Sequence, residues 1–502
     1  MNITFAYKTQ AVDNTKTECL VVFLPKDTNK DAGYLDQLPK SFHRLLKKFL
    51  KLGGFSGKAG QIELAFTNSS HIPRILLAGL GEPAEVDAEK LRRVAGQIGK
   101  KIVDMKIANI AVLPPAYLQK NLASQTATLI AEGIGLGAYT FDQYKTKEKN
   151  DDSGQEPSSI TVTLYDPKKV TEKKALDLGK VKAETANYAR TLGNTPSNDM
   201  TPTVLAQHAE ALAKKHNLIC NVLEESDMEA LGMHMLLGVS RGSREPAKLI
   251  IMEYKHKKAK DTLAIVGKGV TFDSGGISLK PSTSMEEMKF DMCGAAAVMA
   301  TMDAIGVLRP KLNIITVIPT SENLPGGTAQ RPGDIVTSYS GKKVEIINTD
   351  AEGRLILGDA LAYVAKKFNP DAIIDLATLT GACVVALGKY ASGAITNDDV
   401  LCEKVVEAGK SSGEPVWPLP NFPEYGEAIK GKYSDLKNVG GRDAGTITAG
   451  LFLKNFVGDI PWVHLDIAGT AWAVKEIGHI PNSGATGVGV RLLTDLIHNW
   501  KA

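Results

Sequence analysis

The 502-residue sequence lacks several features that would place it outside the ordinary globular enzymes. No apolar run approaches the length of a membrane-spanning helix, roughly 20 residues, so we expect no membrane partner. Its five cysteines, odd in number and without a C-x-x-C pair, argue against a disulfide framework or a structural zinc site. Met1–Lys8 lacks the basic, apolar and small-residue segments of a signal peptide. These absences favour a cytoplasmic protein with reduced thiols.

An excess of charge of one sign is also missing. The sequence has 59 Lys and Arg residues against 56 Asp and Glu residues, a net charge of +3. A nearly neutral surface gives no electrostatic reason to expect nucleic acid as the main partner. The short basic run Lys255–Lys260 is better explained as a solvated turn than as a nucleic-acid patch. The composition, 43% hydrophobic and 23% charged, is globular, and the length predicts more than one domain.

The first part of the chain is typical of a small α/β domain. Its apolar runs predict strands at Cys19–Leu24, Ile62–Phe66, Arg74–Gly79 and Ile160–Leu164, and helices at Leu91–Lys106 and Leu122–Glu132. A charged stretch without apolar residues predicts a loop from Lys145 to Ser159. We therefore expect an N-terminal α/β domain over residues 1–168, followed by a connecting helix over residues 169–192.

Residues 193–502 alternate between strands and helices. Strands are predicted at Lys248–Glu253, Thr262–Val266, Asn313–Ile318, Val344–Ile347, Ala372–Leu376 and Trp462–Leu465, with helices that include Gly294–Ile305 and Arg354–Phe368. This alternation predicts a larger catalytic α/β domain, with a mostly parallel sheet covered by helices on both faces. Such sheets bind ligands beyond the carboxyl ends of their strands. Polar residues follow the predicted strands there: Lys268, Asp273, Asp350, Glu352 and Thr378.

Two local features suggest other kinds of site, a serine nucleophile and a histidine metal ligand, but their sequence surroundings do not fit these roles. Gly238–Gly242 matches the G-x-S-x-G nucleophile elbow, which needs a strand before the serine and a helix after it. Here a helical pattern precedes the serine and a strand follows, so a serine hydrolase is disfavoured. His464 lies within a predicted strand and is more typical of a hydrogen-bonded core residue than of a metal ligand.

Four carboxylates remain as candidates for a metal centre. Asp273 and Asp291 lie among glycines and apolar residues, where solvated charges are unusual. Asp350 and Glu352 are two residues apart, so extended backbone points both to one side. Converging carboxylates repel unless cations neutralise them, and two divalent ions about 3.5–4 Å apart are a common hydrolytic arrangement. Oxygen ligands suit Mn²⁺, Mg²⁺ or Zn²⁺ without choosing strongly among them.

The residues around these acids resemble a known family. Asn348-Thr-Asp-Ala-Glu-Gly-Arg-Leu355 is similar, residue for residue, to the signature of the leucine (cytosol) aminopeptidase family, and Lys268–Lys280 to its other catalytic segment. The similarity continues through Ala377–Ala382, His464–Gly469 and Gly484–Arg491, and it covers about residues 190–495. The first domain resembles the family only in layout and in Phe141–Lys145.

The resemblance implies a role for each site residue. The more tightly bound metal would be held by Lys268, Asp273, Asp291 and Glu352, and the more exchangeable one by Asp273, Asp350 and Glu352. A lysine ligand must be the neutral amine, which nearby dications favour. Lys280 would stabilise the oxyanion, and Arg354 would hold a bicarbonate that acts as general base. The substrate would be lined by the backbone of Thr378 and Leu379, with Met288 and Ala468 facing its first side chain.

The implied function is that of a leucyl aminopeptidase, a metal-dependent exopeptidase. It would release N-terminal leucine and other apolar residues from peptides with a free amine, by attack of a metal-bridging hydroxide. It would assemble as a homohexamer in the cytoplasm, with two Mn²⁺ or Zn²⁺ ions per chain. Two alternatives stay open from the sequence: a DNA-binding regulator that retains the peptidase domain, and another two-metal hydrolase such as a phosphatase.

Overall fold

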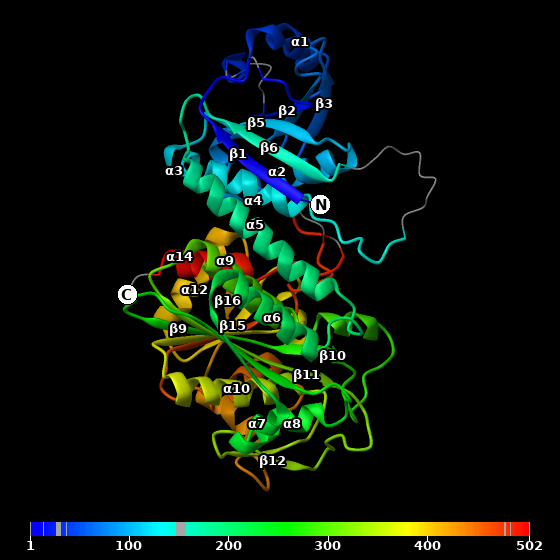
Figure 1. Ribbon diagram of the computed structural model, residues 1–502, viewed down its shortest axis with the longest axis vertical. Coiled ribbons are helices and arrows are strands. Elements are labelled where there is room, and N and C mark those ends of the chain that lie inside the picture. The colour runs from blue at the N-terminus through cyan, green and yellow to red at the C-terminus, as the bar shows by residue number, and fades with distance from the viewer. Residues whose placement is uncertain are drawn as a thin grey trace. The chain divides into compact units, whose positions relative to one another are not determined.

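The computed structural model describes residues 2–13, 15–26, 32–36, 38–146, 157–475, 478–481 and 483–500. Most of the predicted loop Lys145–Ser159 lies outside the described residues. The chain forms two compact units (Figure 1). The N-terminal unit comprises Met1–Asn187 and Lys475–Asn482, and the catalytic unit comprises Tyr188–Val474 and Ser483–Ala502.

The N-terminal unit is built on a six-stranded sheet of order β1-β6-β5-β2-β4-β3. Neighbouring strands run parallel except for β3, which is antiparallel to β4. The strands are β1 (Asn2–Lys8), β2 (Cys19–Leu24), β3 (Ile62–Phe66), β4 (Arg74–Gly79), β5 (Asn109–Leu113) and β6 (Ser159–Tyr165). The helices are α1 (Lys40–Lys51), α2 (Ala88–Asp104), α3 (Lys120–Ala123), α4 (Thr126–Gly137) and α5 (Lys173–Asn194), which continues into the catalytic unit.

Helices cover both faces of this sheet. All six residues of β2 are buried, as expected of a parallel strand with apolar side chains on both faces. Phe42, Leu46 and Leu50 of α1 pack on one face, while α2 and α4 pack on the other. Asp87 caps α2 by accepting the Lys90 N–H at 2.7 Å, which fixes where this helix begins.

The catalytic unit has a nine-stranded sheet and a three-stranded sheet. The large sheet has the order β16-β15-β18-β14-β9-β11-β8-β7, with β10 paired to β11. Its centre is parallel, and β7, β8 and β15 are antiparallel to their inner neighbours. Its strands are β7 (Ile219–Leu223), β8 (Lys248–Tyr254), β9 (Thr262–Gly267), β10 (Gly269–Asp273), β11 (Asn313–Asn323), β14 (Ala372–Ala377), β15 (Ser392–Thr396), β16 (Val416–Pro418) and β18 (Trp462–Asp466).

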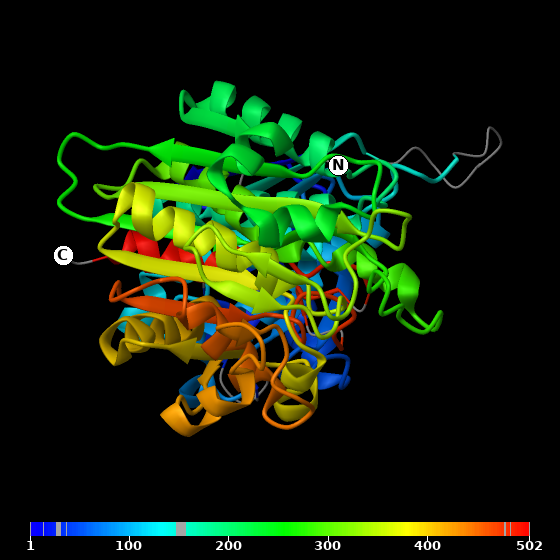
Figure 2. The ribbon, with the colours of Figure 1, turned by 90° about the horizontal axis from the view of Figure 1, so that it is seen from below.

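The remaining elements cover or extend this sheet. The small sheet contains β12 (Ile335–Thr337), β13 (Lys343–Glu345) and β17 (Leu436–Lys437). The helices are α6 (Pro202–His216), α7 (Glu225–Leu231), α8 (His234–Ser240), α9 (Cys293–Leu308), α10 (Gly353–Phe368), α11 (Gly381–Leu387), α12 (Asp399–Ser412), α13 (Gly445–Lys454) and α14 (Val490–His498), with the 3₁₀ segment η3 (Met285–Phe290). Figures 1 and 2 show α9, α12 and α14 on one side of the sheet and α10 on the other, so the predicted covered sheet is confirmed.

One stretch of the described chain, Met285–Leu308, is long and apolar enough by composition to span a membrane. On composition the expected absence of such a stretch is therefore wrong. In the fold, 83% of its most apolar 18-residue segment is buried. The stretch contains α9, whose small side chains pack closely against the parallel strands. It is a core helix and not a membrane span. All five cysteines are free, as predicted.

Candidate metal centre

The structure gathers the four candidate carboxylates near the carboxyl ends of the parallel strands. Lys268 lies between β9 and β10, and Asp273 is the last residue of β10. Asp291 follows η3, and Glu352 directly precedes α10. Side-chain oxygens of Asp273, Asp350 and Glu352 lie within 4.8 Å of one another. Residues from three separate segments of the sequence, at 268–273, 291 and 350–352, thus meet in one cluster.

Lys268 links two of these acids. Its side chain is buried, and Nζ lies 2.8 Å from Asp291 Oδ1 and 2.8 Å from Glu352 Oε1. Nζ also donates to the Thr378 carbonyl at 2.9 Å, so each of its three N–H donors has an acceptor. The Thr378 hydroxyl donates to Asp291 Oδ1 at 2.7 Å. Thr378 therefore touches the cluster through both its backbone and its side chain.

Lys280 contacts the other two acids from a more open position. Its side chain is 21% exposed, Nζ lies 2.7 Å from Asp273 Oδ2, and it also contacts Asp350 Oδ1. The turn between Asp273 and Lys280 requires glycine at position 275. Gly275 has φ +87°, and a Cβ there would lie 2.8 Å from Asp350 Oδ1. The Gly275 N–H donates to Asp273 Oδ1 at 2.9 Å and fixes that carboxylate.

Asp350 and Glu352 reach the cluster by a route that differs from the predicted one. The strand before them is β13, which belongs to the three-stranded sheet and pairs with β12 and β17. The loop after β13 is held instead by Asn438, whose Oδ1 accepts the Ile347 N–H at 2.8 Å. Asn438 Nδ2 donates back to the Asn348 carbonyl at 2.6 Å. A side chain far away in the sequence thus replaces the main-sheet pairing that we expected.

Asn323 is a site residue that the sequence analysis missed. It ends β11, and its Nδ2 donates to Asp273 Oδ1 at 2.8 Å and to the Thr349 carbonyl at 3.0 Å. It therefore joins one acid of β10 to the loop that carries two others. The predicted strand Asn313–Ile318 ends before Pro319, which lacks an N–H; proline is rare within central strands. The observed strand continues to Asn323, which brings this residue to the same edge of the sheet as Asp273.

Burial and mutual repulsion shift the pKa values of these acids. Burial, reinforced by the Glu352 charge, raises the pKa of Asp273 to about 6, although Lys280 and Lys268 oppose it. Burial also raises the pKa of Asp291 and Asp350. Burial would raise the pKa of Glu352 as well, but the two lysines outweigh it and lower this pKa. The acids are thus held together at an electrostatic cost.

The cluster fits divalent cations. Four carboxylates face two ammonium groups, so the site carries an excess of negative charge that buried sites rarely tolerate. Asp291 Oδ2 is buried and has no hydrogen-bond partner among the described residues. An unpaired carboxylate oxygen in such a place is a free ligand position. Carboxylate oxygens at this density suit hard or borderline dications.

Arg354 lies two residues after Glu352, in the first turn of α10. Its Nη1 donates to the Asn438 carbonyl at 2.8 Å, and its Nε is buried without a partner among the described residues. Burial lowers the pKa of the Arg354 guanidinium to about 10. A bound anion would satisfy the unpaired Nε–H and stabilise the cation.

The residues predicted to face substrate surround the cluster to different degrees. Leu379 directly follows Thr378, and the N–H groups of Leu379 and Ala468 share one acceptor, Asp466 Oδ1, at 3.2 and 3.1 Å. Met288 lies in η3, and its carbonyl accepts the Asp291 N–H at 3.3 Å. Thr378, Leu379 and Met288 thus belong to segments that contact the acids or directly follow them, and Ala468 is linked to Leu379 through Asp466.

The two disfavoured patterns of the sequence have structural roles. Ser240 ends helix α8, so the Gly238–Gly242 segment has no strand before its serine. His464 is fully buried in β18, and its Nδ1 lies 2.6 Å from Asp375 Oδ1. The basic run Lys255–Lys260 forms the turn between β8 and β9, in which Lys255 pairs with Glu253 at 2.9 Å.

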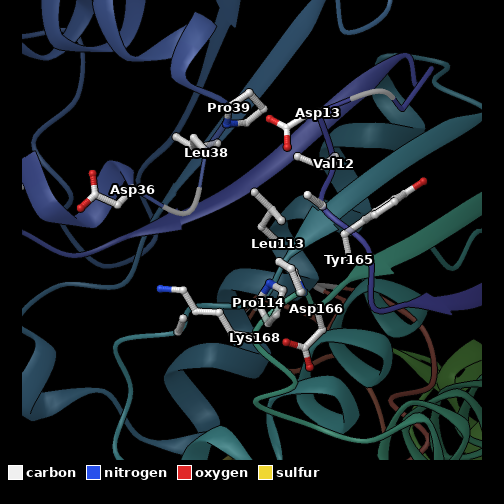
Figure 3. Close-up of a pocket in the computed structure, with 13 residues that line it drawn as sticks. Val12, Asp13, Asp36, Leu38, Pro39, Leu113, Pro114, Tyr165, Asp166 and Lys168 are labelled. Atoms are coloured by element: carbon white, nitrogen blue, oxygen red, sulfur yellow. The ribbon is translucent and has the colours of Figure 1, made fainter.

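The N-terminal unit has a pocket of about 240 Å³ at the carboxyl ends of β1, β5 and β6 (Figure 3). Its floor is apolar and includes Val12, Leu38 and Leu113. Its buried acid, Asp166, accepts the N–H groups of Val170 and Thr171, both at 3.0 Å, and the Tyr7 hydroxyl at 2.9 Å. This carboxylate is already saturated by the unit's own donors, unlike Asp291.

The fold and the site define an α/β metalloenzyme whose centre is built from carboxylates and lysines. The sequence model of the cytosol aminopeptidase family, catalytic domain, matches residues 187–494, and that of the family's N-terminal domain matches residues 20–148. The chain belongs to the cytosol aminopeptidase family, whose members are aminopeptidases with a dinuclear metal centre.

Individual relatives agree over most of the chain. A probable cytosol aminopeptidase of Desulforapulum autotrophicum is 44% identical over 90% of this chain and 89% of its own. One from Geobacter sp. (strain M21) is 46% identical, over 88% and 89%. Among solved structures, the bottromycin maturation enzyme BotP in complex with Mn has a TM-score of 0.83 and 31% identity, covering 96% of this chain and 99% of its own.

Proposed function

We propose that this protein is a two-metal aminopeptidase that removes leucine and other apolar residues from the N-termini of peptides. The observation that carries the proposal is the cluster of four carboxylates, three of them buried, with the unpaired Asp291 oxygen, in a chain of the cytosol aminopeptidase family. The family assignment favours peptide hydrolysis over the phosphatase alternative. The exposed turn at Lys255–Lys260 gives no support to a DNA-binding role.

The ligand set divides between two ions. Lys268, Asp273, Asp291 and Glu352 would hold the tighter ion, and Asp273, Asp350 and Glu352 the exchangeable one. When bound, the ions supply a hydroxide at neutral pH and polarise the substrate carbonyl. The four negative charges of the carboxylates equal the four positive charges of two dications. Lys268 would bind as the neutral amine, and nearby dications favour the loss of its proton. Mn²⁺ or Zn²⁺ fits these ligands, and the Mn in the structure of BotP supports Mn²⁺.

Lys280 and Arg354 would act beside the ions. Burial would lower the pKa of Lys280, but the carboxylates of Asp273, Glu352 and Asp350 outweigh it and raise this pKa. A cationic Lys280 would be a donor to the developing oxyanion. The unpaired Nε–H of Arg354 supports a bicarbonate there, which would supply the general base.

The substrate would lie along the segment that begins at Thr378. Backbone groups of Thr378 and Leu379 would bind its main chain, while Met288 and Ala468 face its first side chain. A free α-amine would complete the coordination at the centre, which restricts cleavage to the N-terminal residue. We further propose a cytoplasmic homohexamer; light scattering of the purified protein should give six chains per particle.

A panel of aminoacyl anilides, measured with and without Mn²⁺, tests this function. Leucyl and other apolar aminoacyl anilides should be cleaved, and their N-acetylated forms should not, because acetylation removes the lone pair of the amine. Equal turnover of free and acetylated substrates would contradict recognition of the amine. Hydrolysis of phosphate esters in place of anilides would overturn the peptidase proposal itself.

A further inference from the structure

Asp466 ends β18, and its carboxylate holds two loops together. Its side chain is fully buried. Oδ1 accepts the N–H groups of Leu379 at 3.2 Å, Thr380 at 3.4 Å and Ala468 at 3.1 Å, while Oδ2 accepts the Thr380 hydroxyl at 2.6 Å. One carboxylate thus binds the loop after β14 and the loop after β18, which belong to neighbouring parallel strands.

The two N–H groups of the first loop determine where its carbonyls point. In a trans peptide the carbonyl of one residue is directed opposite to the N–H of the next. Because the N–H of Leu379 is directed at Asp466, the Thr378 carbonyl points away from it, and this carbonyl does accept the Lys268 ammonium at 2.9 Å. By the same geometry, the Thr380 N–H directs the Leu379 carbonyl away from Asp466.

The second loop has little freedom to adjust by itself. The Ile467 N–H donates to the Ala377 carbonyl at 2.8 Å, which continues the pairing of β18 with β14 by one residue. Gly469 packs directly on the residue that follows α11, because a Cβ at Gly469 would lie 2.2 Å from the Gly388 carbonyl oxygen. Hydrogen bonds and close packing therefore join the two loops, and the Asp466 carboxylate is the acceptor that they share.

We propose that Asp466 is a positioning residue that sets substrate affinity by aiming the Leu379 carbonyl at the main-chain N–H of a bound peptide. The inference rests on the proposed function and names a residue that acts through Leu379 without touching the substrate. A backbone acceptor fixed in advance binds ground state and transition state alike, so its loss raises KM more than it lowers kcat.

Asp375 provides the matched control. It is also fully buried and lies on β14, next to β18, but its carboxylate accepts side chains only. Trp462 Nε1 donates to its Oδ2 at 2.7 Å, and His464 Nδ1 lies 2.6 Å from its Oδ1. Asp375→Asn removes the same charge from the same sheet without releasing either loop.

The test compares Asp466→Ala, Asp466→Asn and Asp375→Asn by kcat and KM for leucyl peptides, metal content and thermal unfolding. Asp466→Ala should keep two ions per chain and raise KM by about 10–100-fold with a smaller change in kcat. Asp466→Asn should recover most of the affinity, since its amide oxygen can still accept the three N–H groups. Asp375→Asn should lower the unfolding temperature and leave KM unchanged.

Three results would overturn the inference: an unchanged KM in Asp466→Ala, equal damage from Ala and Asn, or the same rise in KM from Asp375→Asn. If Asp466→Ala does not fold, Thr380→Val and Thr380→Ser replace it. Valine should raise KM, serine should restore it, and no difference between them would also overturn the inference. A wild-type protein that leaves leucyl anilides intact would instead refute the proposed function.

Discussion

Glu132 of the N-terminal unit and Glu352 of the catalytic unit are both almost fully buried, and each has a buried lysine nearby. Glu132 lies 2.8 Å from Arg92 Nε and 4.0 Å from Lys182 Nζ, so one carboxylate faces two cations. Around Glu352 three more carboxylates share two lysines. A buried ion pair is therefore not by itself a sign of function. An uncompensated excess of one charge is the feature that separates the two sites.

Removal of metal should produce the largest difference between these clusters. Prolonged chelation should abolish activity, and Mn²⁺, Zn²⁺ or Co²⁺ should restore it, because the nucleophile exists only while the ions are bound. Metal analysis of the restored protein should approach two ions per chain.

Glutamine variants of the two buried glutamates show which of the two clusters binds the metal. Glu352→Gln should lose bound metal, whereas Glu132→Gln should keep both ions and lower only the unfolding temperature. Full activity in a preparation with one ion or none would refute the two-metal proposal.

The two lysines of the cluster should differ from each other. Lys268→Ala should reduce occupancy of the tighter site, so that activity requires a much higher metal concentration. Lys280→Ala should keep both ions and lower kcat by roughly 10²–10³, the usual cost of losing one oxyanion donor. Lys280→Arg should restore part of this activity, since a planar guanidinium replaces a compact charge.

Metal content after gel filtration, paired with kcat at saturating Mn²⁺, checks the lysine roles. Lys182→Ala in the N-terminal unit is the control, with an effect on stability alone. Loss of metal in Lys280→Ala together with full occupancy in Lys268→Ala would reverse the two assignments.

Asn323 should have a smaller effect, on metal affinity. Asn323→Ala removes the donor that orients Asp273, and losing such an outer partner typically weakens metal binding by about 10–100-fold. Titration of metal-free protein with Mn²⁺ measures it. Asn397 accepts the Trp462 N–H at 2.7 Å, away from the acids, so Asn397→Ala should leave the affinity unchanged. Equal Mn²⁺ affinities in wild type and Asn323→Ala would show that Asn323 does not support metal binding.

The smallest effect concerns pH and Asp359, which is buried in α10 away from the metal ligands. Burial raises the pKa of Asp359 to about 7, although it accepts the N–H groups of Tyr339 at 2.7 Å and Leu236 at 3.0 Å. The folded protein therefore binds more protons than the unfolded chain between about pH 4 and pH 7. Stability should fall as the pH rises through this range, by at most about 1.4 kcal/mol per pH unit.

Thermal midpoints between pH 5 and pH 8 check the Asp359 prediction. Asp359→Asn cannot ionise, so its midpoint should lack this part of the pH dependence. It should also be lower overall, because the amide nitrogen cannot accept an N–H. Identical pH profiles for the two proteins would show that Asp359 does not titrate in this range.

Much of the architecture could be predicted because apolar runs report burial directly. Cys19–Leu24, Ile62–Phe66 and Arg74–Gly79 are strands with the predicted bounds, since buried strands are continuous apolar runs between polar residues. The predicted end of β11 and the predicted sheet of β13 were wrong, because both depend on which strands pair. β11 continues past Pro319 because its neighbours there supply other hydrogen bonds, and β13 left the main sheet for partners distant in sequence.

The sequence by itself determined which residue types are present for the chemistry: carboxylates and lysines among glycines and small residues, in motifs specific enough to indicate a family. Only the tertiary structure decided how they are supported. Asn323, Asn438 and Asp466 act through hydrogen bonds to residues 26 to 91 positions away. A local pattern can report burial, turns and helix ends, because those depend on neighbouring residues. It cannot report which distant donor reaches a given carboxylate, because that depends on how the strands are ordered in the sheet.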